Sequence, residues 1–307
     1  MGVGRLLRSA REHDLVHIHG DAAALACRPA IGLRPTLITL HGSHLLRRST
    51  GLRGRLARAG ARSSFRHAAG VICVSESELA FARDIAPRAA ERMVLVHNGV
   101  PDPGPLGDAD QPAAREVLGA EADSVVALFV GELSERKQPV QFALAVERAR
   151  VENPAVVGAI VGDGLLRPRL ETMSIPGTRL LGSRDDVRGL IAAADVFVLP
   201  SLWEGLSYAL LEAMSLGRAT LVSDGPGNPD AVGDAGLVFP ASDVGAMTAS
   251  LLRLTEDAEL RRSLGKAAAR RARERFSLEQ MTDATALVYE RALGLSPSPR
   301  AEGSPSR

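Results

Sequence analysis

The fold of this chain is decided by one stretch, which reads Asp195-Val-Phe-Val-Leu-Pro-Ser-Leu-Trp-Glu-Gly-Leu-Ser-Tyr-Ala-Leu-Leu-Glu212. Its first part is a short apolar run that predicts a buried strand. Its second part repeats apolar residues at helical spacing from Leu206 up to a stop at Gly217. We therefore expect Glu204 in the turn between strand and helix, and Glu212 about two turns along the helix. At ~1.5 Å rise per residue, the two carboxylates would lie roughly 12 Å apart.

The predicted start of this helix is a candidate phosphate site. A helix that begins at Leu206 presents the unpaired backbone N–H groups of Leu206 and Ser207, and these donors together with the helix dipole favour a phosphate. A carboxylate on either side can accept hydrogen bonds from sugar or ribose hydroxyls. The pattern fits a nucleotide-sugar, although two solvated glutamates on an ordinary helix would leave the same letters.

Composition narrows the class of protein. A length of 307 residues with 45% hydrophobic residues indicates one large or two medium globular domains. A net charge of +1 and 3% aromatic residues give no argument for nucleic-acid binding. Cys27 and Cys73 are isolated and are expected to be reduced thiols. Without an apolar run of about 18 residues or a secretory signal, we expect a cytoplasmic protein, or one attached to a membrane surface.

Strands alternate with helices over residues 14–96 and again over residues 124–239. This alternation predicts parallel sheets covered on both faces, which bind ligands at the carboxyl ends of their strands. The turn-rich segment 98–105 is interpreted as a linker. We therefore expect an α/β protein with two doubly wound domains. The predicted parts are residues 1–103, residues 104–278, a helix at 279–294 and a disordered Ser/Pro-rich tail at 295–307.

Five motifs, taken in order, carry a resemblance to a known family. Besides residues 199–214 they are Val130-Gly-Glu-Leu-Ser-Glu-Arg-Lys137, Val161-Gly-Asp-Gly164, Leu181-Gly-Ser-Arg-Asp-Asp-Val187 and Leu221-Val-Ser-Asp-Gly-Pro-Gly-Asn-Pro-Asp230. In this order and spacing they resemble the retaining glycosyltransferases of family 4, with their E-x7-E signature, over roughly residues 15–294. The resemblance implies the GT-B architecture, in which two Rossmann-like domains face a cleft and a final helix crosses back to the first domain. It also implies a nucleotide-sugar donor as substrate, no cofactor and no metal ion, and transfer with retention of anomeric configuration and no covalent enzyme intermediate.

The resemblance also assigns roles to individual residues. Glu204 would hydrogen-bond the donor sugar, and His41, at the end of a predicted strand, would orient the reacting sugar as a second catalytic residue. In the turn that begins at Gly131, Lys137 matches the family's phosphate-binding lysine, and Arg136 beside it would assist. A satisfied histidine at a strand end and a solvated basic pair at a helix start are the alternative interpretations.

The remaining donor-binding residues follow in the same way. Glu212 would hold the ribose hydroxyls, the amides of Leu206 and Ser207 would stabilise the departing diphosphate, and the backbone near Arg184 would contact the base. Where the family often has an arginine, this chain has Glu132. The family's earlier βα units, with their glycine-rich loop, are not matched either, so we expect a shortened first domain. A non-catalytic nucleotide-sugar-binding subunit, or a degenerate fragment of the enzyme, is the alternative function, whereas a nucleotide-sugar epimerase fits these motifs poorly.

The stretch 47–66 is basic and amphipathic. Four arginines form one helical stripe beside three apolar residues, and no acidic residue lies between Gly42 and His67. The stripe comprises Arg55, Arg58, Arg62 and Arg66, with Leu52, Leu56 and Ala59 beside it. Such a helix can rest on anionic lipid or grip an anionic acceptor, and a solvated arginine face would look the same. The expected partners are therefore a nucleotide-sugar and a glycan, lipid or small-molecule acceptor, with peripheral membrane contact through this stretch.

Overall fold

The structure is a computed structural model that describes residues 3–104, 111–173 and 175–296. The chain divides into two compact units, which we describe separately. The first unit is drawn from Met1–Val74, Glu78–Val96 and Met281–Arg307, and the second from Ser75–Ser77 and His97–Gln280. Most of the tail predicted to be disordered, residues 297–307, lies outside the described residues.

The first unit is built on a parallel sheet with the strand order β1-β2-β3-β4. Its strands are β1 (Val16–His19), β2 (Thr36–Leu40), β3 (Gly70–Cys73) and β4 (Met93–Leu95). Every residue of the two central strands, β2 and β3, is buried. Two-sided burial explains why these strands have continuous apolar runs in the sequence rather than alternating polar and apolar residues.

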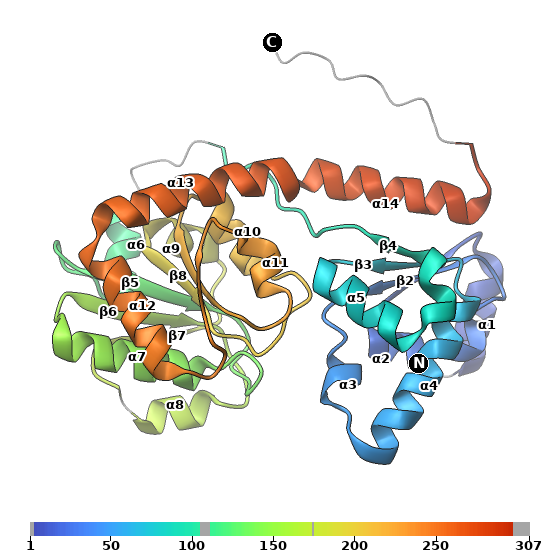
Figure 1. The fold of residues 1–307 in the computed structure, drawn as a ribbon, viewed down its shortest axis with the longest axis horizontal. Coiled ribbons are helices and arrows are strands. Elements are labelled where there is room, and N and C mark those ends of the chain that lie inside the picture. Colours follow the sequence, from blue (N-terminus) through green and yellow to red (C-terminus); the bar gives the residue numbers. More distant parts are fainter. Residues whose placement is uncertain (1–2, 105–110, 174, 297–307) are drawn as a thin grey trace, which may run out of the picture. The chain divides into compact units, whose positions relative to one another are not determined.

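Helices cover this sheet on both faces. The first unit contains α1 (Val3–Glu12), α2 (Asp21–Ala26), α3 (His44–Arg48), α4 (Gly51–His67), α5 (Glu76–Ile85) and most of α14 (Leu278–Leu293), with 3-10 turns at Arg28–Ala30 and Pro87–Arg92. Successive strand residues face opposite sides of the sheet. Ile38 accordingly belongs to the same apolar cluster as Phe65 of α4, whereas Leu37 packs with Val288 of α14. The C-terminal helix α14 therefore closes one face of the first sheet (Figure 1).

The second unit is built on a parallel sheet with the strand order β10-β9-β8-β5-β6-β7. Its strands are β5 (Val125–Val130), β6 (Val156–Val161), β7 (Thr178–Gly182), β8 (Val196–Leu199), β9 (Ala219–Ser223) and β10 (Leu237–Phe239). The strand order reverses direction between β5 and β8, which pair side by side although they are far apart in the sequence. The loops after β5 and β8 therefore lie next to each other, at the place where doubly wound sheets bind ligands.

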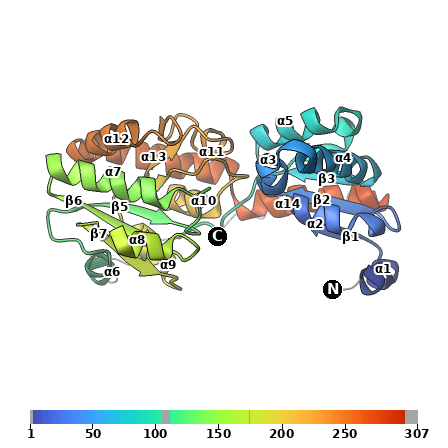
Figure 2. The ribbon, with the colours of Figure 1, turned by 90° about the horizontal axis from the view of Figure 1, so that it is seen from below.

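Eight helices surround this sheet within the described chain: α6 (Gln111–Leu118), α7 (Pro139–Glu152), α8 (Arg167–Met173), α9 (Val187–Ala193), α10 (Tyr208–Ser215), α11 (Asn228–Val232), α12 (Val244–Glu256) and α13 (Ala258–Arg275). Helices α7 and α12 lie over one face, and α6 and α9 lie over the other (Figure 2). The apolar core between the sheet and α7 includes Phe129 and Phe142, both fully buried.

The α/β class and the two doubly wound parallel sheets predicted from the sequence are confirmed. The predicted start of one helix was wrong, since the helix expected from Leu206 begins at Tyr208. The short helix α11 was not predicted. In the described ranges, no helix combines the length and apolar character needed to cross a bilayer.

The packing of α14 on the first sheet leads to a stability prediction. Leu37 is 0% exposed, whereas Leu52 on α4 is 70% exposed. Leu37→Ala should lower the free energy of unfolding of the first unit by about 3 kcal/mol, because it leaves a cavity between the sheet and α14. Leu52→Ala should change it by less than about 0.5 kcal/mol. Urea unfolding followed by circular dichroism measures both, and equal effects would contradict the packing described.

Candidate functional site

Three loops of the second unit meet at the carboxyl edge of its sheet. The loops follow β5, β8 and β9, and backbone hydrogen bonds join them. Leu202 N donates to Arg136 O at 2.8 Å, and Glu204 N donates to Pro226 O at 2.8 Å. Gly227 has φ +91°, and a β-carbon there would lie 2.6 Å from the carbonyl oxygen of Glu204. Glycine is therefore required at this position for the third loop to approach the second.

Glu204 lies at the centre of these loops and is 6% exposed. Its Oε1 atom is 2.7 Å from Lys137 Nζ and 2.9 Å from Arg136 Nη1. Arg136 also donates to the carbonyl oxygen of Trp203 at 3.3 Å, and its Nη2 lies 3.8 Å from Glu132 Oε2. The structure thus brings together three residues predicted from separate motifs, and we call Arg136, Lys137 and Glu204 the ion cluster.

The charges of the ion cluster determine the protonation state of Glu204. Burial by itself would raise the pKa of this carboxyl, but the positive charges of Lys137 and Arg136 outweigh burial and hold the pKa below its usual value. Glu204 is therefore a carboxylate at neutral pH. One buried anion faces two mostly buried cations, whose ammonium and guanidinium groups have further N–H donors for an anionic ligand.

Gly131 and Gly162 allow the loops beside the ion cluster to pack tightly. A β-carbon at Gly162, where φ is +136°, would lie 1.9 Å from Gly131 O. The aliphatic stem of Lys137 passes close to Gly131, since a β-carbon there would lie 3.6 Å from Lys137 Cδ. Gly131 therefore contributes space to the site, whereas Lys137 contributes the charge.

The start of α10 lies directly after the loop that carries Glu204. Ser207 occupies the cap position, and Leu211 N donates to Ser207 O at 3.0 Å. Leu206 lies before the cap, is 3% exposed, and accepts a hydrogen bond at its carbonyl oxygen from Asn98 Nδ2 at 2.7 Å. The helical N–H groups therefore begin at Tyr208, two residues later than predicted. Asn98, which fixes this turn, was interpreted from the sequence only as part of a linker.

Glu212 and Arg184 lie apart from the ion cluster. Glu212 is half-buried in α10; burial raises its pKa, and the charge of Arg188 opposes this shift. Arg184 follows β7, which is two strands away from β5. Its side chain pairs with Asp186 at 2.8 and 2.6 Å, at an exposed position. The guanidinium of Arg184 is thus held by a neighbouring carboxylate.

His41 belongs to a histidine cluster at the carboxyl edge of the first sheet. His41 Nε2 lies 3.0 Å from His19 Nδ1, with the two rings stacked at 5.3 Å between centroids. His17, two residues before His19, packs its ring 4.2 Å from that of His19, so both side chains face the same side of β1. His17 is hydrogen-bonded to Tyr289 Oη at 2.6 Å and to Thr39 Oγ1 at 2.7 Å. In the described part of the chain, no group of three potential metal-ligating side chains is arranged to hold an ion.

Two members of the histidine cluster, His17 and His41, are neutral near pH 7. Burial, together with the neighbouring His19 and His41, lowers the pKa of His17 to about 4. Burial also lowers the pKa of His41, with smaller contributions from His19 and His44. His41 is therefore an uncharged imidazole at neutral pH, which can donate one hydrogen bond and accept one.

Glu78 holds the turn that follows His41, and sequence reasoning missed it. It is 0% exposed, and its carboxylate accepts hydrogen bonds from Gly42 N at 2.6 Å, Ser43 Oγ at 3.1 Å and Val74 N at 3.2 Å. Burial raises the pKa of Glu78, and these hydrogen bonds offset only part of the rise. An acidic residue in the first turn of a helix has no distinctive pattern in the sequence, because its role here depends on donors in the loops that follow β2 and β3.

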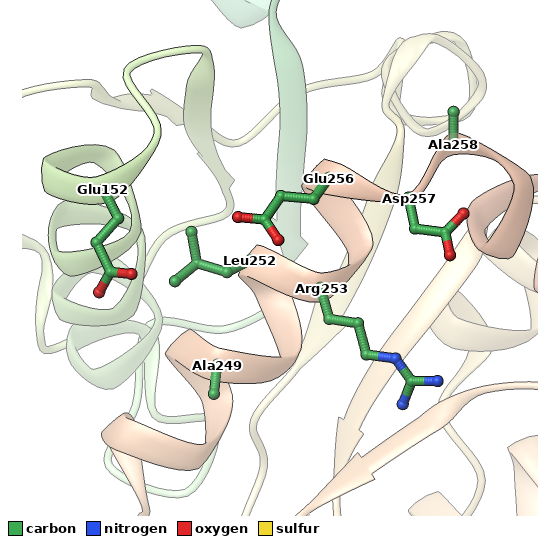
Figure 3. A pocket seen from close by; sticks show the side chains of 7 residues that line it. All are labelled: Glu152, Ala249, Leu252, Arg253, Glu256, Asp257 and Ala258. Carbon is green, nitrogen blue, oxygen red and sulfur yellow. The ribbon is translucent and has the colours of Figure 1, made fainter.

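A surface pocket elsewhere in the second unit has a different character. It is lined by Glu152, Ala249, Leu252, Arg253, Glu256, Asp257 and Ala258 (Figure 3). Glu152 ends α7, a helix that starts after the carboxyl end of β5 and returns to the amino end of β6, so this pocket lies at the opposite edge of the sheet from Glu204. Three carboxylates and one arginine make it unsuited to a diphosphate.

Comparisons with known proteins identify the family. Residues 2–102 match the family described as Glycosyltransferase Family 4, and residues 124–257 match Glycosyl transferases group 1. The two sheets define a GT-B fold: Anabaena HepE in complex with UDP-glucose superimposes with a TM-score of 0.83 at 22% identity, over 94% of this chain and 81% of that chain. The chain belongs to family 4 of the glycosyltransferases.

Curated relatives match different shares of the chain. The 2-deoxystreptamine N-acetyl-D-glucosaminyltransferase of Streptomyces fradiae is 30% identical over 85% of this chain and 67% of its own length. The UDP-Gal:alpha-D-GlcNAc-diphosphoundecaprenol alpha-1,3-galactosyltransferase of Escherichia coli is 37% identical over 47% of this chain. This match spans 40% of the Escherichia coli enzyme's length. A separate match, to a D-inositol 3-phosphate glycosyltransferase from Streptomyces bingchenggensis, spans 44% of that relative's length.

The ion cluster leads to a prediction about stability and pH. Glu204→Gln leaves Lys137 and Arg136 buried without their counter-charge, so it should lower the free energy of unfolding at pH 7 by about 3 kcal/mol. Because the folded-state pKa of Glu204 is lowered, its stabilisation is present above the unfolded-state pKa and is lost as the pH falls through the folded-state pKa. The difference between variant and wild type should therefore shrink in acid.

Urea unfolding at a series of pH values measures this difference. Glu132→Gln is the matched control, since the Glu132 side chain is 63% exposed and lies 3.8 Å from Arg136; it should change stability by less than about 0.5 kcal/mol. A Glu204→Gln variant as stable as wild type at pH 7 would contradict the role of Glu204 as counter-ion.

Proposed function

We propose that this chain transfers a sugar from a nucleotide-sugar donor to an acceptor, with retention of anomeric configuration and without a metal ion or cofactor. The observation that carries the proposal is the ion cluster at the carboxyl edge of the second sheet, directly before the start of α10. Two cations and a helix N-terminus lie on adjacent loops there. This combination is the one that a diphosphate requires.

The cations of the ion cluster retain hydrogen-bonding capacity for the donor. A lysine ammonium has three donors and an arginine guanidinium has five. In the structure, Lys137 and Arg136 both point to the same oxygen, Oε1 of Glu204. Their other N–H groups supply the hydrogen bonds to the phosphate oxygens in our proposal, with the first N–H groups of α10 on the other side.

The predicted side chains keep their roles in this proposal, whereas the amides predicted at Leu206 and Ser207 are replaced by the N–H groups of α10, from Tyr208 onward. Glu204 accepts a hydrogen bond from the donor sugar while it orients the two cations, and Glu212 binds the ribose hydroxyls. The backbone near Arg184 contacts the base, and its side chain stays paired with Asp186. His41, as a neutral imidazole, orients the reacting sugar.

The chemistry that follows is the departure of a nucleoside diphosphate. Negative charge develops on the leaving phosphate as the glycosidic bond breaks, and Lys137, Arg136 and the α10 amides are fixed donors for that charge. Because Glu204 already holds both cations in place, little reorganisation is needed when the charge appears. The acceptor hydroxyl then attacks the anomeric carbon from the face that the diphosphate leaves and gives its proton to the departing phosphate oxygen, so the new glycosidic bond retains the configuration.

Relatives support the class of donor. The name of the Escherichia coli relative specifies UDP-galactose as donor and a diphosphoundecaprenol-linked sugar as acceptor. The Anabaena structure contains UDP-glucose. By analogy, we infer a nucleoside diphosphate sugar as donor here, and a glycan or lipid-linked acceptor.

Donor binding provides the direct test. In isothermal titration with a panel of sugar nucleotides and free nucleoside diphosphates, at least one should bind saturably. Lys137→Ala should weaken that binding about tenfold or more, since it removes a charge-assisted hydrogen bond to phosphate. It should leave the binding of the corresponding nucleoside, which lacks phosphate, unchanged.

Arg169→Ala is the matched control for the loss of one positive charge, because the Arg169 side chain is 58% exposed and lies 3.8 Å from Glu135. It should bind the diphosphate like wild type. Absence of saturable binding to a folded sample would overturn the proposed function. If the protein binds a sugar nucleotide but transfers its sugar to none of the acceptors tried, the alternative function, a non-catalytic nucleotide-sugar-binding subunit, would be favoured instead.

We further propose that α4 mediates peripheral contact with an anionic membrane surface. Leu52 and Leu56 are 70% and 64% exposed, one helical turn apart. The surrounding arginines Arg55, Arg58 and Arg66 are exposed, whereas Arg62 donates a hydrogen bond to Ile85 O. Exposed leucines flanked by arginines match the boundary between lipid headgroups and acyl chains.

Vesicle co-sedimentation tests the membrane proposal. Binding to vesicles with phosphatidylserine should exceed binding to neutral vesicles, and it should fall about fivefold or more for each of Leu56→Asp and Arg55→Glu. Arg270→Glu on α13, at an exposed position, is the control for the charge change and should bind like wild type. Equal binding to neutral and anionic vesicles would contradict the role of the arginines.

A further inference from the structure

We propose that His19 is a positioning residue for His41: its ring nitrogen accepts a hydrogen bond that fixes the orientation of the His41 imidazole and leaves the other His41 nitrogen as an acceptor for the substrate. The proposal rests on the role assigned above to His41. It adds a residue from β1 to a site otherwise assigned to the ends of other strands.

The geometry of the two rings supports a direct hydrogen bond. His41 Nε2 and His19 Nδ1 are 3.0 Å apart, and the rings lie nearly parallel, with an interplanar angle of 16°. β1 and β2 are paired so that His19 lies opposite Thr39, two residues before His41. The register of the parallel strands therefore brings the two imidazoles together where both strands end.

The direction of the hydrogen bond is part of the proposal. His19 is exposed, so solvent can accept a hydrogen bond from its Nε2–H, which leaves His19 Nδ1 as the acceptor nitrogen. His41 Nε2 then donates to His19 Nδ1 across the 3.0 Å between them. A neutral imidazole has one donor and one acceptor nitrogen. His41 Nδ1 then carries the lone pair, and it has no hydrogen-bond partner within the described residues.

Two further contacts keep this arrangement rigid. The His17 ring packs 4.2 Å from the His19 ring and is itself hydrogen-bonded to Thr39 and Tyr289. In the turn after His41, the carboxylate of Glu78 accepts a hydrogen bond from the backbone N–H of Gly42. His41 is thus fixed at its backbone by a carboxylate and at its ring by a second imidazole, which leaves a single nitrogen free for a sugar hydroxyl.

Nuclear magnetic resonance on the resting protein tests the hydrogen bond directly. With 15N-labelled histidine, wild type should show a scalar coupling between His41 Nε2 and His19 Nδ1 across the hydrogen bond. The coupling should vanish in His19→Phe, which keeps an aromatic ring but has no nitrogen. Absence of the coupling in wild type would overturn the inference, whatever the enzyme's activity.

Steady-state kinetics tests the consequence for the reaction. His19→Phe should lower kcat about tenfold, the equivalent of one hydrogen bond, while KM for the donor changes less than about twofold. His19→Asn can place an amide oxygen near the position of Nδ1 and should restore kcat to within about threefold of wild type. His13→Phe, the same substitution at an exposed histidine, is the control and should behave like wild type.

The two measurements separate this inference from the proposed function. A wild-type kcat in His19→Phe, or a kcat in His19→Asn as low as in His19→Phe, would overturn the inference. A wild-type protein that shows the coupling but turns over no sugar nucleotide would overturn the proposed function, and the hydrogen bond would still have been established.

Discussion

The second unit depends on the attraction between one buried carboxylate and two cations. Glu204 is almost fully buried, and without Lys137 and Arg136 the removal of its charge from water would be costly. The same attraction fixes the side chains of both cations at the carboxyl edge of the sheet. The loops after β5, β8 and β9 therefore form one surface that holds two cations in fixed positions, and the ligand chemistry of this surface follows from their N–H donors.

Each of the two units uses a buried glutamate to organise the ends of its strands, but the two glutamates differ in their partners. Glu204 faces positive charges, and its pKa is lowered. The pKa of Glu78 is raised by burial, which the hydrogen bonds from backbone and hydroxyl donors and the charge of Arg47 offset only in part. The first arrangement creates an electrostatic site, whereas the second fixes a turn and thereby the backbone next to His41.

Individual residues show how far sequence reasoning extends in this protein. The turn from Gly131 to Lys137 and the position of Glu204 between strand and helix were predicted, because each depends on local spacing. The start of α10 was placed two residues early, because the apolar character of Leu206 suggested helix. In the structure Leu206 is buried and its carbonyl is bound by Asn98, a contact that spans 108 positions in the sequence. No local pattern carries such information.

The sequence by itself determined the alternation of strands and helices, and with it the two doubly wound sheets, because burial on both faces leaves apolar runs that are visible residue by residue. It also determined which loops carry the candidate residues. Only the tertiary structure decided the partners of those residues: Glu204 with two cations, His41 with His19, and Gly42 with Glu78. These pairings arise where neighbouring parallel strands end, and strand order and register depend on the packing of the whole sheet.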